Sequence, residues 1–241
     1  MDILFYILLL LIAFLYAAVG HGGASGYLAL MAFYSIAPEV MRPTALLLNV
    51  FVSLIAFIQY YRNGYFRWNL FWPFAITSIP AAFLGGSISI EPMYYKKILA
   101  LLLLFPILKL SGIRFESEHK IKELNIYIAL LTGAIIGLLS GMIGIGGGII
   151  LSPLILLFHW ADIKKTAAIS ALFIFVNSVA GIAGSFLQHF QFTGEMTTML
   201  LVAITGAFAG SYLGAKKFEN ILLKRILAAV LLIASVKLIM T

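Results

Sequence analysis

The chain has 241 residues, of which 63% are hydrophobic and 10% are charged, and it contains no cysteine. Soluble domains carry about 25% charged residues, so this composition indicates an integral membrane protein, and the lack of cysteine excludes disulfides and thiol redox chemistry. The formal net charge is +7. Its basic residues stand between hydrophobic segments, as in positive-inside loops, and we therefore expect no nucleic-acid partner.

Ten hydrophobic segments follow one another along the chain, and most are long enough to cross a bilayer as helices. Two of them are short arms of about 11 residues that follow glycine-rich turns, and such an arm reaches only about halfway across the hydrocarbon core. The sequence therefore predicts an all-α polytopic membrane protein. The segments are 3–19, 26–36, 43–60, 70–88, 96–111, 126–143, 149–159, 166–188, 196–214 and 221–239.

The two glycine-rich turns are residues 20–26 (GHGGASG) and 144–148 (GIGGG). Each glycine costs about 1 kcal/mol relative to alanine in a helix, and an unwound backbone at membrane depth is tolerated mainly where it is buried in protein or lines a polar cavity. Each turn also opens a short helix whose first N–H groups lack intrahelical partners and carry partial positive charge. We therefore expect the two turns to meet near the bilayer midplane and to bind a small anion.

The turns belong to an internal repeat of about 110 residues. Residues 20–23 match 144–147 at an offset of 124, and residues 75–110 match 203–238 at an offset of 128. The matches include glycine, glutamate, lysine and threonine, which chance rarely aligns in so apolar a chain. We divide the chain into a first membrane repeat (1–111), a cytoplasmic linker (112–125) and a second membrane repeat (126–241).

Two topologies agree with these segments. If each broken segment crosses the bilayer, the chain has eight spans in parallel repeats, and its basic residues divide seven against nine. If each broken segment folds back as a re-entrant helical hairpin, each half has three spans plus a hairpin and the repeats are inverted. In that case twelve basic residues lie on one side of the membrane and four lie on the other, namely Arg42, Lys96, Lys97 and Lys237. The positive-inside rule favours this second topology, with both termini extracytoplasmic and the central loop cytoplasmic.

Catalytic patterns are lacking in the sequence. All nine acidic residues lie in or beside loops, no motif for a metalloprotease or a serine hydrolase occurs, and the four histidines are not spaced as metal ligands. Paired intramembrane carboxylates, which mark many proton and cation pathways, are also missing. We therefore expect no enzyme activity, no metal and no cofactor.

The polar residues near the turns are the candidates for contact with substrate. His21 is the one ionisable residue inside either turn, so it could bind an anion, carry a coupled proton or simply form a neutral hydrogen bond. Asn49 and Asn177 lie inside apolar runs, where an amide needs either neighbouring helices or a ligand as partner. The predicted substrate-binding residues are His21, Gly22, Gly23, Ser25, Asn49, Gly146, Gly147, Gly148, Ser152 and Asn177.

Glycines inside the spans have a simpler interpretation, because small residues let membrane helices approach closely. We expect this packing role for Gly133, Gly137, Gly181, Gly184, Gly206, Gly210 and Gly214.

The motif at residues 141–148 (GMIGIGGG), which continues to Pro153 and Leu154, resembles the sulfite exporter TauE/SafE family of membrane permeases. The degenerate copy at residues 20–23 resembles it as well, and the resemblance extends over nearly the whole chain. It implies the movement of sulfur-containing anions, such as sulfite and sulfonates, across a bacterial cytoplasmic membrane. The first copy departs from the family pattern at His21 and Ala24 and has no proline after the turn.

Together these features predict a secondary transporter, most simply an exporter, of small sulfur-containing anions in the cell (inner or plasma) membrane. An anion channel on the same turns, an uptake permease for a related oxyanion, and a structural protein are the alternatives. The expected partners are the anion, the lipid bilayer and a coupled proton or other ion, and the protein could be a monomer or a homodimer.

Overall fold

The computed structural model describes residues 2–18, 20–110, 121–188 and 193–216, and within these ranges it forms helices and no strands. Five of the described helices are long and apolar enough to cross a membrane. They are α3 (Pro38–Arg62), α4 (Trp68–Ser87), α6 (Ile126–Ile143), α8 (Ile163–Ser185) and α9 (Gly194–Lys216). The other helices are α1 (Ile3–Ala18), α2 (Ala24–Phe33), α5 (Pro92–Leu110), α7 (Gly148–Leu157) and the 3-10 helix η1 (Phe186–Gln188). The segment predicted at 221–239 lies outside the described residues.

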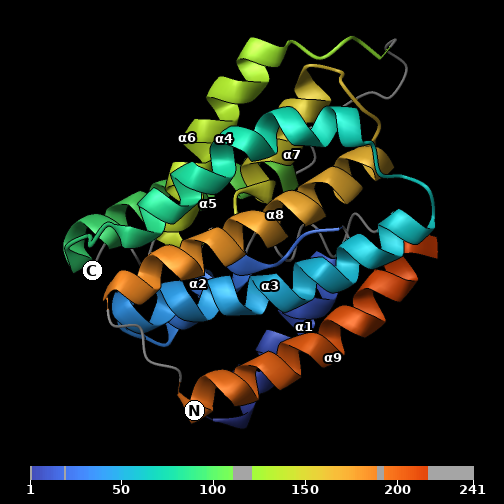
Figure 1. Ribbon diagram of the computed structural model, residues 1–241. Coiled ribbons are helices and arrows are strands. Elements are labelled where there is room, and N and C mark those ends of the chain that lie inside the picture. Colours follow the sequence, from blue (N-terminus) through green and yellow to red (C-terminus); the bar gives the residue numbers. More distant parts are fainter. Residues whose placement is uncertain (1, 19, 111–120, 189–192, 217–241) are drawn as a thin grey trace.

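The helices cross between two ends of the molecule. Figure 1 shows α3 and α9 running in one direction and α4 and α8 running in the other. We call the end where α3 finishes and α4, α6 and α8 begin the basic end. There the ammonium group of Lys164 donates to the hydroxyl of Tyr65 over 3.1 Å, which joins the first turn of α8 to the α3–α4 loop. The basic residues in the loops and helix ends here are Arg62, Arg67, Lys122, Lys164 and Lys165.

At the opposite end α3 begins and α4 finishes. Arg42, in the second turn of α3, donates to the carbonyl oxygens of Ile88 over 2.9 Å and of Gly85 over 3.0 Å, and also to that of Gly86. These carbonyls belong to the last turn of α4 and to its C-cap Ile88, where the helix dipole favours a cation. Arg42 was counted above among the loop residues on this side, and the structure corrects that interpretation: it is a buried residue inside a helix.

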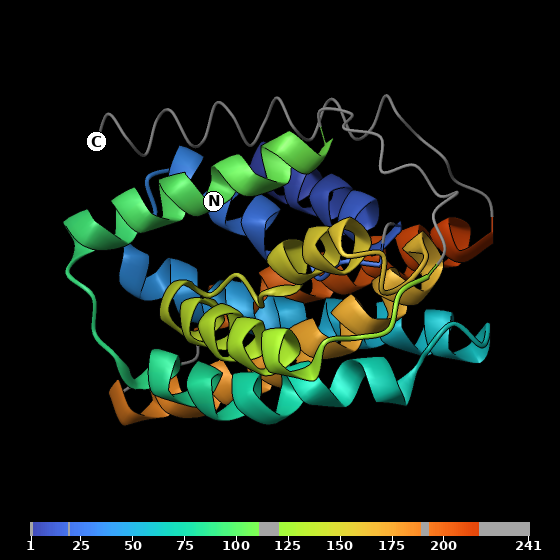
Figure 2. The same ribbon diagram turned by 90° about the horizontal axis from the view of Figure 1, so that it is seen from above.

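Two helical hairpins enter the bundle from opposite ends. In the first, α1 and α2 are closed at their base by the rings of Phe5 and Tyr34, whose centroids are 5.1 Å apart. In the second, α6 and α7 are closed by a bond from the amide of Lys122 to the carbonyl of His159, over 2.9 Å. The first base lies where α3 begins, and the second lies where α8 begins, at the basic end (Figure 2). The two glycine turns are the tips of these hairpins.

The helix pairs repeat under exchange of the two halves. Helix α3 packs along α8, α4 packs along both α6 and α8, and α9 packs along both α1 and α3. If α1, α3 and α4 are exchanged with α6, α8 and α9, the pair α3–α8 becomes itself and every other pair becomes another pair of the same set. The internal repeat seen in the sequence is therefore matched by a repeat in the contacts.

Glycines bring these helices close together, as predicted. A Cβ atom on Gly133 of α6 would lie 2.5 Å from the carbonyl oxygen of Phe74 in α4, and one on Gly210 of α9 would overlap the carbonyl oxygen of Phe14 in α1. The packing role is therefore confirmed where the structure describes the surroundings. Gly137, Gly184 and Gly206 likewise meet backbone carbonyls of a neighbouring helix, Gly181 lies against Leu46 and Gly141, and the surroundings of Gly214 lie outside the described residues.

Large apolar side chains also cover the outside of the bundle. Ile76 of α4, Leu131 of α6 and both Leu201 and Phe208 of α9 are each more than half exposed. A water-soluble protein rarely shows so much contiguous apolar surface, whereas lipid tails are its natural neighbours. The polar groups that matter for function must therefore be sought inside the bundle.

Candidate functional site between the two glycine turns

Both glycine turns contain left-handed backbone that only glycine adopts cheaply. Gly23 has φ 93° and is the N-cap of α2, and Gly147 has φ 76° and is the N-cap of α7. Neither helix start has a side-chain cap. The first N–H groups of a helix have no partner inside it. In both short helices these N–H groups follow an uncapped glycine in the interior of the bundle.

The side chain of Asn49 lies between the two turns. A Cβ atom on Gly22 would lie 2.5 Å from its Oδ1 atom, and a Cβ atom on Gly146 would lie 2.5 Å from its Nδ2 atom. Both positions would also be 2.8 Å from the Cγ2 atom of Ile174. The turns, 124 residues apart in sequence, therefore meet across one fully buried amide of α3.

Several buried side-chain atoms of the bundle, those of this amide included, have no hydrogen-bond partner among the described residues. Both side-chain atoms of Asn49 belong to this group, together with Oδ1 of Asn177 and the hydroxyls of Ser178 and Ser140. The Ser178 hydroxyl is 3.2 Å from the position of a Cβ on Gly146. An unpartnered buried polar group costs about 1–3 kcal/mol, so each of these groups is expensive unless a ligand becomes its partner.

A second polar cluster joins the two hairpins to α8. His21 Nε2 lies 2.8 Å from the hydroxyl oxygen of Ser152, which lies 2.8 Å from that of Ser170. The Ser152 hydroxyl also donates to the carbonyl of Gly148 over 2.8 Å. Because a hydroxyl has a single proton, Ser152 must accept from both other groups, and His21 then donates from Nε2. The histidine predicted from sequence is thus bonded across the interface between the hairpins.

The structure separates the ten predicted residues into groups. Gly22, Asn49 and Gly146 meet at the buried amide, while Asn177 lies on α8 with its Nδ2 atom donating to the carbonyl of Phe173 over 2.8 Å. His21, Gly148 and Ser152 belong to the second cluster. The remaining three face other neighbours: Ser25 bonds to the Tyr16 hydroxyl over 2.7 Å, Gly23 faces Tyr27, and Gly147 faces Ile136 and Phe173.

Sequence reasoning did not select Ser140 and Ser178, and it misplaced Arg42. For Arg42 a signal was available, because Pro38 favours the first turn of a helix and so puts Arg42 one turn further in. The backbone oxygen of Arg42 also lies 2.9 Å from where Gly144 would carry a Cβ, so the base of the second turn rests on this part of α3. The two serines carry no comparable signal.

Acidic and metal-binding groups do not gather at the site. Among the residues that the structure describes, no three His, Cys, Asp or Glu side chains come close enough to hold a metal ion. The chemistry that Asn49 and its serine neighbour Ser178 offer is neutral hydrogen bonding, added to the partial positive charge of two helix starts. Such a combination suits an anion that must be released again.

Comparisons with known proteins match the chain to membrane transporters. A family profile described as "Sulfite exporter TauE/SafE" matches residues 5–238. The chain is 34% identical over 232 residues to the probable membrane transporter protein y4hK of Sinorhizobium fredii, which covers 95% of this chain and 94% of that protein. It is 24% identical over 234 residues to the probable membrane transporter protein YunE of Bacillus subtilis, covering 86% and 83%.

A shorter match links the chain to the probable membrane transporter protein MamO of Magnetospirillum gryphiswaldense, at 34% identity over 117 residues, 45% of this chain and 18% of that protein. No solved structure matches the chain. The family match and the match to y4hK both extend over nearly the full sequence, through both glycine turns. The protein therefore belongs to the sulfite exporter TauE/SafE family and is a multi-pass membrane transporter.

Proposed function

We propose that this protein is a secondary transporter that exports a small sulfur-containing oxyanion, such as sulfite or an organosulfonate, across the cytoplasmic membrane. The observation that carries the proposal is the Asn49 amide, which is fully buried between the two glycine turns with both polar atoms unpartnered among the described residues. The family description supplies the substrate class.

In this proposal the anion binds at the tips of the two hairpins. The Nδ2 group of Asn49 and the hydroxyls of Ser140 and Ser178 donate to its oxygens, and the starts of α2 and α7 add backbone N–H groups and partial positive charge. Discontinuous helices serve transporters with inverted repeats in this way. Because none of these side chains is cationic, the anion is held without a fixed counter-charge and can leave on either side.

We also propose that the halves are inverted repeats with re-entrant hairpins. Three observations support this topology: the hairpins enter from opposite ends, equivalent helices run antiparallel in Figure 1, and the contact between Lys164 and Tyr65 joins the start of α8 to the α3–α4 loop, which eight spans would place on opposite faces. Single cysteines at Asn63 and Lys164 test it. Both should react with an impermeant reagent from the cytoplasmic face, and one at Glu39 from outside. Labelling of Asn63 and Lys164 from opposite faces would establish the eight-span topology instead.

Transport by purified protein in liposomes tests the function. We expect saturable sulfite or sulfonate flux that a proton or ion gradient drives to accumulation, together with binding of the same anion in detergent. Asn49→Leu should abolish both. Flux that never saturates and follows only the electrochemical gradient of the anion would make the protein a channel, and accumulation driven only inwards would make it an uptake permease. Neither flux nor binding for sulfite, sulfonates, thiosulfate and sulfate would refute the proposal.

A further inference from the structure

A separate cavity of about 290 Å³ opens at the basic end, among loops that the anion site does not use. The α3–α4 loop contributes Arg67, α4 contributes Leu70, and the start of α8 contributes Lys165. Leu124, just before α6, and Trp160, between α7 and α8, complete most of its wall. The cavity therefore lies where both halves of the chain and the segment leading into the second half come together.

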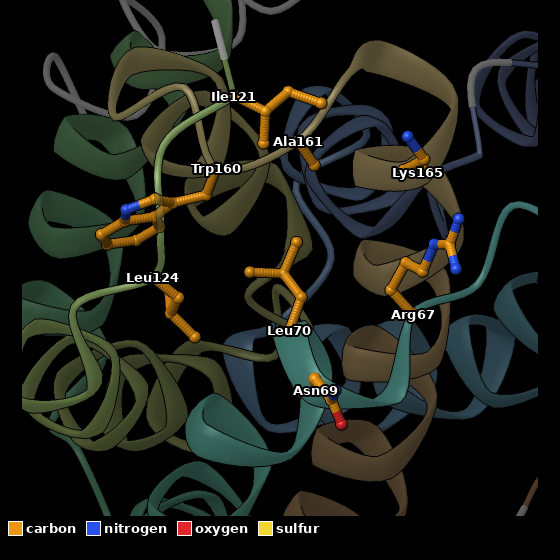
Figure 3. Close-up of a pocket in the computed structure, with 8 residues that line it drawn as sticks. All are labelled: Arg67, Asn69, Leu70, Ile121, Leu124, Trp160, Ala161 and Lys165. Atoms are coloured by element: carbon orange, nitrogen blue, oxygen red, sulfur yellow. The ribbon is translucent and has the colours of Figure 1, made fainter.

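Its charged and apolar groups lie on different sides. Figure 3 shows Arg67 and Lys165 on one side of the cavity, while Trp160, Leu124 and Ile121 lie on the other. None of the described lining residues is acidic. This division matches a molecule with an anionic group at one end and an apolar body at the other.

Arg67 and Lys165 are not equally available to bind an anionic group. Lys165 is paired over 2.7 Å with Asp162, the N-cap of α8. Partial burial acts to raise the pKa of Asp162, but the hydrogen bonds and charge of Lys165 lower it overall, so this carboxylate is ionised at neutral pH. Arg67 forms no ion pair with any described carboxylate. Its guanidinium, with several donors in a planar fork, is well suited to a phosphate group.

The position of the cavity agrees with a lipid ligand. Tyr61 and Trp68, on either side of the α3–α4 loop, are 58% and 61% exposed, as expected for aromatic residues at the membrane–water interface. Arg67, the N-cap of α4, directly precedes Trp68, and phospholipid phosphates are expected near such interfacial aromatic residues. Basic pockets between transmembrane helices at such a depth bind anionic lipid headgroups.

We propose that this cavity binds the phosphate headgroup of an anionic phospholipid of the phosphatidylglycerol type. Arg67 and Lys165 bind the phosphate oxygens, and the glycerol and upper acyl carbons lie against Trp160, Leu124 and Ile121. A volume of about 290 Å³ is at the lower limit of ligand pockets and fits a headgroup rather than a whole lipid. A choline headgroup is disfavoured because its cation would face two others.

Binding of soluble short-chain lipid to the detergent-purified protein tests this directly, without any transport measurement. Dioctanoylphosphatidylglycerol should bind more tightly than dioctanoylphosphatidylcholine by tenfold or more, and added salt should weaken its binding. The double variant Arg67→Gln/Lys165→Gln should lose about thirtyfold in affinity, since each basic residue near a lipid surface contributes about fivefold. Arg67→Lys, which keeps the charge, should retain most of the affinity.

The matched control is Arg62→Gln/Lys164→Gln, which removes two charges from the same loops but from outside the cavity. It should bind phosphatidylglycerol normally. Equal losses in both double variants would mean a diffuse basic surface, and equal binding of the two lipids would mean an apolar groove; either result overturns the proposal. Free glycerol phosphate binding as tightly as the lipid would overturn it too, because the site would then be one for a soluble phosphate ester.

Discussion

Leucine has nearly the shape of asparagine but no hydrogen-bonding atoms, so Asn49→Leu isolates the role of the amide between the turns. Each unpartnered buried polar atom costs about 1–3 kcal/mol, and Asn49 has two of them. Removing both should stabilise the ligand-free protein by about 1–3 kcal/mol after allowing for imperfect packing of the new methyl groups. By the usual size scaling this raises the melting temperature by about 2–12 °C. The same change should abolish anion binding.

Thermal unfolding and anion titration of the purified variants measure the two effects separately. Asn177→Leu is the matched comparison, because only Oδ1 of Asn177 is unpartnered while its Nδ2 atom already bonds Phe173. Its gain in stability should be smaller than that of Asn49→Leu. A fall in stability of more than about 1 kcal/mol for Asn49→Leu, with anion affinity unchanged, would show that the amide serves the fold and would refute the reasoning.

Four further substitutions follow from the same geometry. Gly146→Ala and Gly147→Ala both place alanine at a positive φ and should each cost about 1–3 kcal/mol of stability. Only the first should lower anion affinity tenfold or more in titrations, because its Cβ meets the buried amide whereas that of Gly147 meets apolar side chains. Gly210→Ala should lower the melting temperature and leave affinity normal, since its Cβ overlaps the carbonyl of Phe14. Arg42→Lys should lower stability by about 1–3 kcal/mol, measured by thermal unfolding, because a single ammonium cannot reproduce the forked contacts at the end of α4. Equal affinities for the two alanine variants of the second turn would remove the amide contact from the mechanism.

The hairpin tips could be predicted from sequence because a glycine cluster interrupts a membrane helix and the apolar arm after it is too short to cross the bilayer. The boundaries came within a few residues: the arms expected at 26–36 and 149–159 are the helices Ala24–Phe33 and Gly148–Leu157. The place of Asn49 between both tips could not be predicted. It depends on how elements 124 residues apart pack, and local pattern carries no such information.

The serines in the membrane helices show the same limit of prediction from sequence. The hydroxyl of Ser53 donates to the carbonyl of Asn49 within its own helix, over 2.6 Å, which is a common way for a membrane helix to satisfy a serine. Ser140 and Ser178, in equally apolar helices, have no partner among the described residues. Only the neighbours brought by the fold distinguish these cases, so a sequence cannot say which serine serves a ligand.

The two repeats differ most where they touch. At the offset of 124, His21 falls on Ile145 and Ser152 falls on Leu28, so each half has a polar residue where the other half is apolar. The structure brings these two residues within 2.8 Å of each other. The histidine that distinguishes the first turn from its repeat is thus bonded to a serine that distinguishes the second half. His21 and Ser152 form an asymmetric polar bridge between otherwise equivalent hairpins.

In such a bridge a neutral and a protonated histidine would affect anion transport differently. Imidazole changes charge between about pH 5 and 8, whereas an asparagine in its place does not. We expect His21→Asn to flatten the pH dependence of anion transport in that range, while Ser152→Ala shifts it but keeps a titrating group. The stability effects of the two changes should couple by about 1 kcal/mol in a double-mutant cycle, since the bond they share is lost only once. If the stability effects of the two changes simply add and the pH profile of transport is unchanged, the bridge has only a packing role. The asymmetry of the repeat would then need a cause other than the coupling of a proton to the anion.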